Sequence, residues 1–133
     1  MEAAALTLHG LHAGAMLFVS TVTARTLMKA CSNKDEDLIK RFFPIWWPAG
    51  RDLMLPLGVA CCALWGTHYA RARVPHAAAA AAAVGFTVAW TGLAMMEDID
   101  ALRRATGAGV LDITRRFCAR HHVRTVASLA SFA

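Results

Sequence analysis

The chain has 133 residues, of which 57% are hydrophobic, and it carries a formal net charge of +5. This length is typical of one domain, and the mean hydropathy of +0.43 is high for a soluble domain of this size. A soluble bundle of fully buried helices is the alternative, but it would leave so short a chain little polar surface. We therefore interpret residues 1–133 as a single membrane-embedded helical domain.

Three runs without Asp, Glu, Lys or Arg dominate the sequence: Ala3 to Ala24, Leu53 to Ala70 and Val74 to Met96, of 22, 18 and 23 residues. An α-helix rises about 1.5 Å per residue, so ~20 apolar residues cross a bilayer core of roughly 30 Å. Each run is predicted to span the membrane. The first lacks the basic segment and the cleavage site of a secretory signal, and we expect it to be retained.

The basic residues are distributed as in a membrane protein rather than a nucleic-acid-binding protein. Twelve Lys and Arg residues lie in the segments 25–51 and 103–124, whereas only Arg71 and Arg73 lie between the second and third spans. Because cytoplasmic loops carry the excess of positive charge, this asymmetry places the N-terminus outside and the two basic segments inside. We expect the lipid bilayer as a partner and no nucleic acid.

The first span carries polar and small residues that suit contacts with other helices. Gly10 and Gly14 have the G-x-x-x-G spacing that lets a second helix approach closely. Ser20 and Thr23 can donate hydrogen bonds across a helix interface. Arg25 is predicted to end this span.

The first inside segment is predicted to turn and then to be irregular. Asn33 to Asp37 forms a polar cluster typical of a turn, and Pro44 and Pro48 are expected to break any regular helix. Trp46 and Trp47 lie beside these prolines. Indole rings anchor helices at the membrane interface, but two adjacent rings also provide a flat platform for an aromatic substrate.

The second and third spans are predicted to form an antiparallel pair. Arg51 and Asp52 stand at the start of the second span, where they can pair, and Gly58 and Gly66 allow close packing within it. The connection from Arg71 to about Val74 is very short, which favours antiparallel neighbours.

The fourth helical segment is predicted to begin near Leu111 and to be shortened. Only Thr125 to Ala133 is free of charge there, and nine residues cover about 13 Å. This segment either crosses incompletely or turns its polar half toward the bundle interior or the headgroups. The predicted fold is an all-α, antiparallel transmembrane bundle of three clear spans plus this shortened fourth helix.

Four histidines fall in the outer half of the predicted bundle: His9, His12, His68 and His76. Converging histidines can hold a haem or a metal ion, which would make the protein an electron carrier with a Soret band. The alternative is a set of histidines that hydrogen-bond between helices or at the interface, without a cofactor.

His121 and Arg124 are three residues apart and share a helix face on the inner side. A histidine beside an arginine can remove a proton from a phenol-like substrate while the cation holds the resulting anion. Asp100 would contribute to this catalytic group, and Trp46, Trp47 and Arg51 would bind the substrate. The alternative is an ion-pair cluster of the inner acidic and basic residues that joins the ends of the last three helices.

Four segments resemble the family of small four-helix membrane proteins that includes the fungal anthrone oxygenases. They are Gly14-Ala15-Met16, Leu53-Met54-Leu55-Pro56-Leu57, Trp90 to Leu102, and His121-His122-Val123-Arg124-Thr125. The resemblance implies oxidation of a tricyclic anthrone to an anthraquinone by molecular oxygen, without a known cofactor. His121 and Arg124 match the H-x-x-R pair of the family. Glu97 to Asp100 stands where the family has a Pro-Thr-Asn-Asn-like stretch.

Besides the haem- or metal-binding electron carrier, two functions remain open from the sequence. The first is oxygenase-like modification of a flat phenolic substrate with no cofactor. The second is a non-catalytic accessory subunit of a larger membrane complex, such as a respiratory or energy-converting one. Homo-oligomers and contacts with other membrane helices fit either function.

The predicted sidedness is open to direct measurement. A protease or a membrane-impermeant label should reach the Asn33 to Asp37 segment only after the inner side of the membrane has been exposed. Equal access from the outside of intact cells would contradict the orientation derived from the basic residues.

Overall fold

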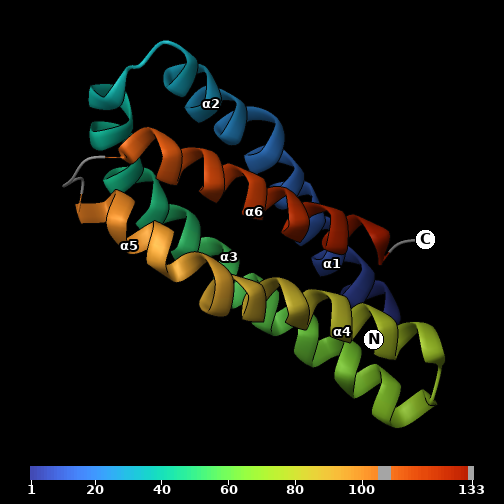
Figure 1. The fold of residues 1–133 in the computed structure, drawn as a ribbon. Helices are drawn as coiled ribbons and strands as arrows, with labels where there is room; N and C mark the ends of the chain where they lie inside the picture. The colour runs from blue at the N-terminus through green and yellow to red at the C-terminus, as the bar shows by residue number, and fades with distance from the viewer. Residues whose placement is uncertain (105–108, 132–133) are drawn as a thin grey trace.

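The computed structural model describes residues 1–104 and 109–131, and the part of the chain that it describes is helical without strands. Its helices form four antiparallel rods (Figure 1). They are α1 (Glu2–Phe18) continued by a π-helical turn (Val19–Thr23) and α2 (Ala24–Ser32); α3 (Glu36–Ala72); α4 (Pro75–Trp90) continued by a π-helical turn (Thr91–Met95) and α5 (Met96–Arg104); and α6 (Val110–Ala130). The predicted all-α antiparallel bundle is confirmed.

Three of the rods are long and apolar enough to cross a membrane: Glu2–Ser32, Glu36–Ala72 and Pro75–Arg104. Large apolar side chains cover the outside of the bundle, including Leu93, which is 89% exposed, and Ile45, which is 78% exposed. Outward apolar side chains of this size are expected where the surrounding solvent is lipid rather than water. The length and apolarity of these helices indicate an integral membrane protein.

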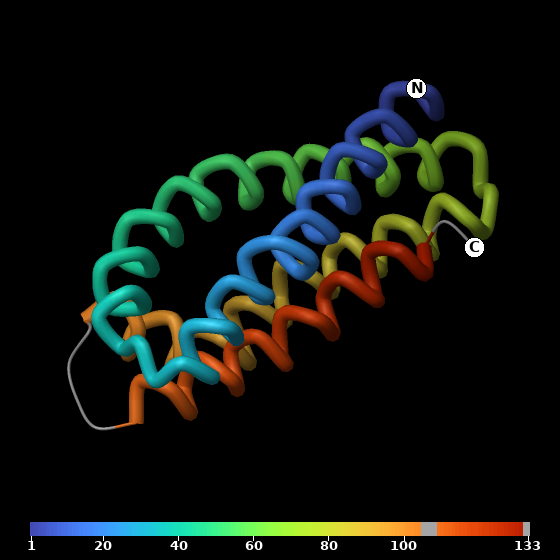
Figure 2. The backbone as a smooth tube through the Cα atoms, turned by 90° about the horizontal axis from the view of Figure 1, so that it is seen from above, coloured from blue at the N-terminus to red at the C-terminus, as the bar shows by residue number. Residues whose placement is uncertain are grey.

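The bundle has two distinct ends (Figures 1 and 2). The N-terminal end holds Met1, the turn between α3 and α4, and the last residues of α6. The basic end holds the turn between α2 and α3, the end of α5 and the start of α6. Each end has its own buried apolar cluster. The cluster at the basic end contains Phe43, Trp47 and Phe117, and the cluster at the N-terminal end contains Cys61 and Trp65.

Local sequence signals explain where α3 begins and ends. The Asp35 side chain accepts a hydrogen bond from the backbone N–H of Leu38 at 2.9 Å and so caps the helix. At the other end Arg73 adopts a left-handed conformation with φ 57°, and Pro75 occupies the first turn of α4. The tight turn makes α3 and α4 antiparallel neighbours, as predicted.

The prediction that Pro44 and Pro48 break the helix is wrong. Both lie inside α3, together with Pro56, and Figure 2 shows α3 as a bowed helix rather than two separate segments. Each proline removes one backbone donor and bends the helix. Phe43 and Trp47 beside these prolines are buried in the apolar cluster at the basic end, and this packing favours a continuous, bent helix over one that ends there.

The first rod also departs from the sequence prediction. Its helix continues past Arg25 to Ser32, with the Arg25 side chain exposed. Gly10 and Gly14 are exposed, and no atom of the described residues would lie within 4 Å of a Cβ at either position, so close approach of a helix there stays a prediction for other chains.

Close helix packing occurs instead at Gly58. A Cβ there would lie 3.1 Å from Cγ2 of Val88 and 3.4 Å from Nε2 of His12, so this glycine lets α1 and α4 approach α3. No such neighbour lies within 4 Å at Gly66. Of the two glycines predicted to allow close packing in the second span, only Gly58 does so among the described residues.

The fourth rod is shorter than the other three, as predicted, with 21 residues from Val110 to Ala130. Its polar residues divide between two sides. Thr114, His121, Arg124 and Ser128 are buried against the other rods, whereas Arg115, Arg116 and His122 are exposed. Of the alternatives open from the sequence, only one stripe of polar residues therefore faces the bundle interior. Ala133 lies outside the described residues.

Candidate functional site

A cavity of about 320 Å³ lies between the two apolar clusters, with walls from all four rods. Both π-helical turns border it, through Val19 on one side and Thr91 and Gly92 on the other. π-Helical turns inside α-helices are frequent at functional sites because they widen the helix and shift its register locally. The remaining lining residues are His12, Met16, Trp46, Trp47, Gly50, Arg51, Met54, Leu55, Val88, Met96, Arg103, His121 and Arg124.

The cavity brings together five of the six residues predicted for the site: His121, Arg124, Trp46, Trp47 and Arg51. They come from the start of α3 and the second half of α6, which are far apart in sequence. The sixth, Asp100, does not line the cavity. Its carboxylate lies 3.8 Å from the Arg103 guanidinium, and both side chains are nearly half exposed.

His121 is held in one orientation by neighbours from the first rod. It is 2% exposed, and its Nδ1 lies 3.1 Å from the hydroxyl of Ser20, which in turn lies 2.6 Å from the hydroxyl of Thr125. Because Nδ1 is engaged, Nε2 is the ring nitrogen that remains for a molecule in the cavity. Ser20 thus makes the contact between helices that its polarity predicted, and it does so inside a π-helical turn.

Arg124 is the unusual group of this cavity. Its side chain is 7% exposed, and its buried Nε has no hydrogen-bond partner. Within residues 1–104 and 109–131 no hydrogen bond or ion pair reaches its guanidinium. A buried cation without a counter-ion costs several kcal/mol in free energy, so such groups are rare unless an anion arrives.

The charges around the cavity are all of one sign. Arg51, Arg103 and Arg124 line it, and none of the described lining residues is acidic. Arg51 donates two hydrogen bonds to the neighbouring Asp52 at 2.8 and 2.6 Å, as its position in the sequence predicted. Arg124 is therefore the cation whose charge remains uncompensated.

His12 joins this site, which sequence reasoning did not predict. It is fully buried, its Nδ1 lies 3.3 Å from the hydroxyl of Ser128, and its buried Nε2 has no hydrogen-bond partner. Sequence position groups His12 with the outer histidines, because the position of a residue along a span predicts its depth in the membrane but not the direction in which its side chain points. The four-residue spacing of His12, Met16 and Ser20 puts them on one face of the first span, and this spacing could have predicted that His12 faces the same space as Ser20.

The four outer histidines separate into different environments. His9 accepts a hydrogen bond from Nε1 of Trp65 at 3.2 Å, and its Nε2 lies 2.8 Å from the hydroxyl of Ser131. His68 and His76 lie instead at the N-terminal end beside Glu2. Among the described residues the only group able to share one metal ion is Glu2, His68 and His76.

An ion-pair cluster does join the third and fourth rods, and it is separate from His121 and Arg124. The fully buried Asp98 carboxylate accepts hydrogen bonds from Arg116 at 2.7 Å and from Arg120 at 2.8 Å. Arg120 also donates to the carbonyl of Ala94, and Trp90 donates to the carbonyl of Arg120. The ion-pair cluster predicted for the inner charges therefore forms around Asp98 and does not include His121 or Arg124.

Comparison of the chain with protein-family models, with curated proteins and with solved structures gave no match. Function must therefore be argued from the residues that the fold brings together.

Two aspartates near the end of the third rod differ in burial and in the arginines with which they pair. Asp98→Asn should lower the free energy of unfolding by about 2 kcal/mol, because it removes the charge that pairs two arginines at a buried site. Asp100→Asn is the matched control and should change it by less than about 0.5 kcal/mol, because its pair is exposed. Denaturant titration in mild detergent, followed by circular dichroism, measures both. Equal effects would contradict the role assigned to Asp98.

Proposed function

We propose that this protein binds a flat apolar molecule with an ionisable hydroxyl inside the membrane, and that it oxidises this molecule with molecular oxygen. The observation that carries the proposal is the buried Arg124 guanidinium without a counter-ion, beside His121, in a cavity bordered by Trp46 and Trp47. The proposal includes the orientation with the basic end inside.

The character of the cavity supports a ligand that is apolar except for one anionic group. Its walls are mostly aliphatic and aromatic, including Met16, Met54 and the two tryptophans. Trp47 is 7% exposed and stacks on Phe43, with ring planes 1° apart, so it presents a rigid wall. A flat ring system resting there would place an oxyanion near Arg124. Its charge would supply the counter-ion that the protein lacks.

The proposed chemistry starts with proton removal. His121 takes a proton from the ring methylene of the substrate, which is acidic because the carbonyl on the opposite side of the same ring takes up the negative charge. Arg124 holds the resulting enolate oxygen, which is the ionised hydroxyl of the enol form. Molecular oxygen oxidises the enolate to a hydroperoxide at the ring carbon, and the proton returns from His121 to the peroxide. Loss of water then leaves a second carbonyl, so CH₂ and O₂ become C=O and H₂O. Arg51 lines the cavity and is partly exposed. Asp100 does not line the cavity and pairs with Arg103, which does.

The resemblance to the anthrone oxygenases supports the same assignment of His121 and Arg124. The H-x-x-R pair of the resemblance is the pair that the fold turns into the cavity. Glu97 to Asp100, where the chain departs from the family, contributes the ion pair of Asp98 rather than a lining residue.

His121→Ala should lower quinone formation from 1,8-dihydroxyanthrone by at least about 100-fold, the lower range for loss of a general base. Arg124→Met should also lower it and weaken substrate binding, because the enolate loses its cation. His122→Ala is the matched control, because His122 is exposed and adjacent, and it should turn over like the unmodified protein. Oxygen uptake and quinone absorbance measure the rates.

Anthrones also oxidise slowly without a protein, so the rate in detergent alone is subtracted. Unfolding midpoints of the variants show that each is folded. A His121→Ala protein with unchanged turnover would overturn the assignment of the base. An unmodified protein that adds nothing to the detergent rate would overturn the oxygenase.

A second candidate, an accessory subunit of a larger membrane complex, is favoured by the outward face of α1. Gly10 and Gly14 lie exposed on this face with open space around them, so a helix of another chain can approach there. If the protein is such a subunit, extraction from its own membrane in mild detergent should give a large assembly of constant stoichiometry. A small homo-oligomer without other polypeptides would contradict this candidate.

A further inference from the structure

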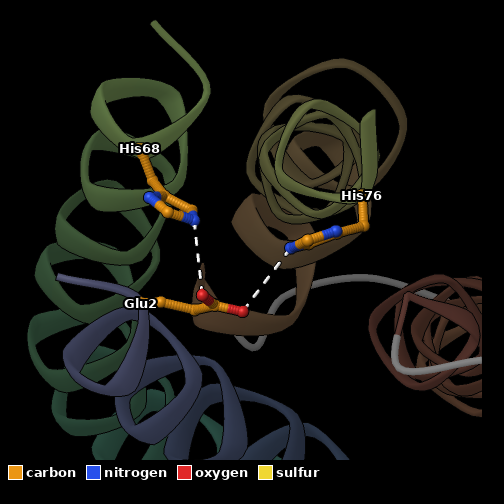
Figure 3. A group of neighbouring side chains, drawn as sticks. All are labelled: Glu2, His68 and His76. Carbon is orange, nitrogen blue, oxygen red and sulfur yellow. Dashed lines mark ion pairs between the residues drawn. The ribbon is translucent and has the colours of Figure 1, made fainter. Parts of the chain in front are cut away.

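Three side chains with metal-binding atoms meet at the N-terminal end of the bundle, and none of them lines the cavity. Figure 3 shows Glu2 of α1 between His68 of α3 and His76 of α4. One carboxylate oxygen of Glu2 lies 3.6 Å from Nε2 of His68, and the other lies 3.6 Å from Nε2 of His76. The three ligand atoms all lie within 4.8 Å of one another.

We propose that Glu2, His68 and His76 bind a divalent transition-metal ion, with Zn²⁺ as the ion that their chemistry suits best. Two imidazoles and one carboxylate form a three-ligand set that zinc proteins use when the fourth position is left to water. Imidazole suits zinc, copper and nickel, whereas the oxygen-rich sites of Mg²⁺ and Ca²⁺ do not use it.

The observed geometry needs only a small adjustment to accept the ion. With bonds of 2.0–2.1 Å, the ligands of a tetrahedral zinc ion lie roughly 3.4 Å apart. Each distance from Glu2 is close to this value, but the two involve different carboxylate oxygens, so the carboxylate either binds through both oxygens or turns to bring one of them between the histidines. The ligand atoms of all three residues lie within 4.8 Å of one another, and the His76 side chain is 61% exposed at the start of α4, where it has room to turn.

His68 gives an independent indication of a missing ligand. Its side chain is 14% exposed, and its buried Nε2 has no hydrogen-bond partner, because Glu2 is 3.6 Å away. In Figure 3 this nitrogen faces the space between the three side chains. A metal ion there would satisfy a buried polar atom that the protein alone leaves unsatisfied.

The ion would join three rods at the N-terminal end of the bundle. Glu2 belongs to the first rod, and the two histidines belong to the two helices of the α3–α4 pair. Trp65 lies against both histidines, with ring centroids 6.1 Å from each, and backs the site with apolar surface. No residue of this site lines the cavity, so the inference does not depend on the proposed function.

The first test is stoichiometric binding by the whole chain, prepared without a polyhistidine tag and stripped with a chelator. We expect one Zn²⁺ per chain by calorimetry and a rise in the unfolding temperature on adding Zn²⁺. His76→Ala and Glu2→Gln should each weaken Zn²⁺ binding by more than about tenfold, the lower bound seen even for loss of an outer-shell partner. His122→Ala removes an exposed histidine elsewhere and should bind like the unmodified protein.

The second test locates the ion through Trp65. Bound Cu²⁺, which quenches nearby indole fluorescence, should quench part of the tryptophan signal, and Trp65→Phe should remove that part. An unmodified protein that binds no Zn²⁺ would overturn the proposal. So would Zn²⁺ binding that survives both His76→Ala and Glu2→Gln, because the ion would then lie elsewhere.

Discussion

The buried carboxylate of Asp98 is the contact on which the geometry of the cavity depends. It accepts hydrogen bonds from Arg116 and Arg120, one helical turn apart on α6, and so fixes the rotation of α6 against α5. Arg124 lies one further turn along the same stripe. No carboxylate of residues 1–104 or 109–131 pairs with it there, and the fixed rotation directs it into the cavity together with His121.

This arrangement divides the arginines of α6 into two kinds. Arg116 and Arg120 are 49% and 33% exposed and share one buried anion, so their charges are compensated and partly hydrated. Arg124 has no anion paired with it among the described residues, and its side chain is less exposed to water than those of Arg116 and Arg120. In a low-dielectric interior an uncompensated charge attracts an anion far more strongly than it would in water. Under the proposed function, the anionic ligand would offset the free-energy cost of burying Arg124.

Much of this fold follows from simple sequence features. Three charge-free runs predicted three of the rods, and the short connection at Arg71–Val74 predicted that the second and third rods are antiparallel neighbours. The three-residue spacing of His121 and Arg124 predicted that they share a helix face. These features succeed because length, apolarity and helical period act locally. They also placed two tryptophans near the basic end, where they border the cavity with His121 and Arg124.

Some of the predictions depended on surroundings that the sequence does not display. Prolines often end helices, but Pro44 and Pro48 lie beside Phe43 and Trp47, whose burial in the apolar cluster at the basic end keeps α3 continuous. Arg25 continues its helix because a long side chain can carry its charge outward while its stem stays against apolar surface. Gly10 and Gly14 mark a face suited to close contact, but the spacing alone does not say whether the contact lies inside or outside the chain.

The position of the cavity follows from where the helices lose regularity. Both π-helical turns lie at its wall, and each changes the register between the residues before and after it. Ser20 in the first turn engages His121, and Thr91 and Gly92 in the second present little side-chain volume to the space. Regular helices with larger residues at these places would fill the gap between the two apolar clusters. The irregular turns therefore keep an apolar volume open beside the one arginine of α6 that has no anion of its own.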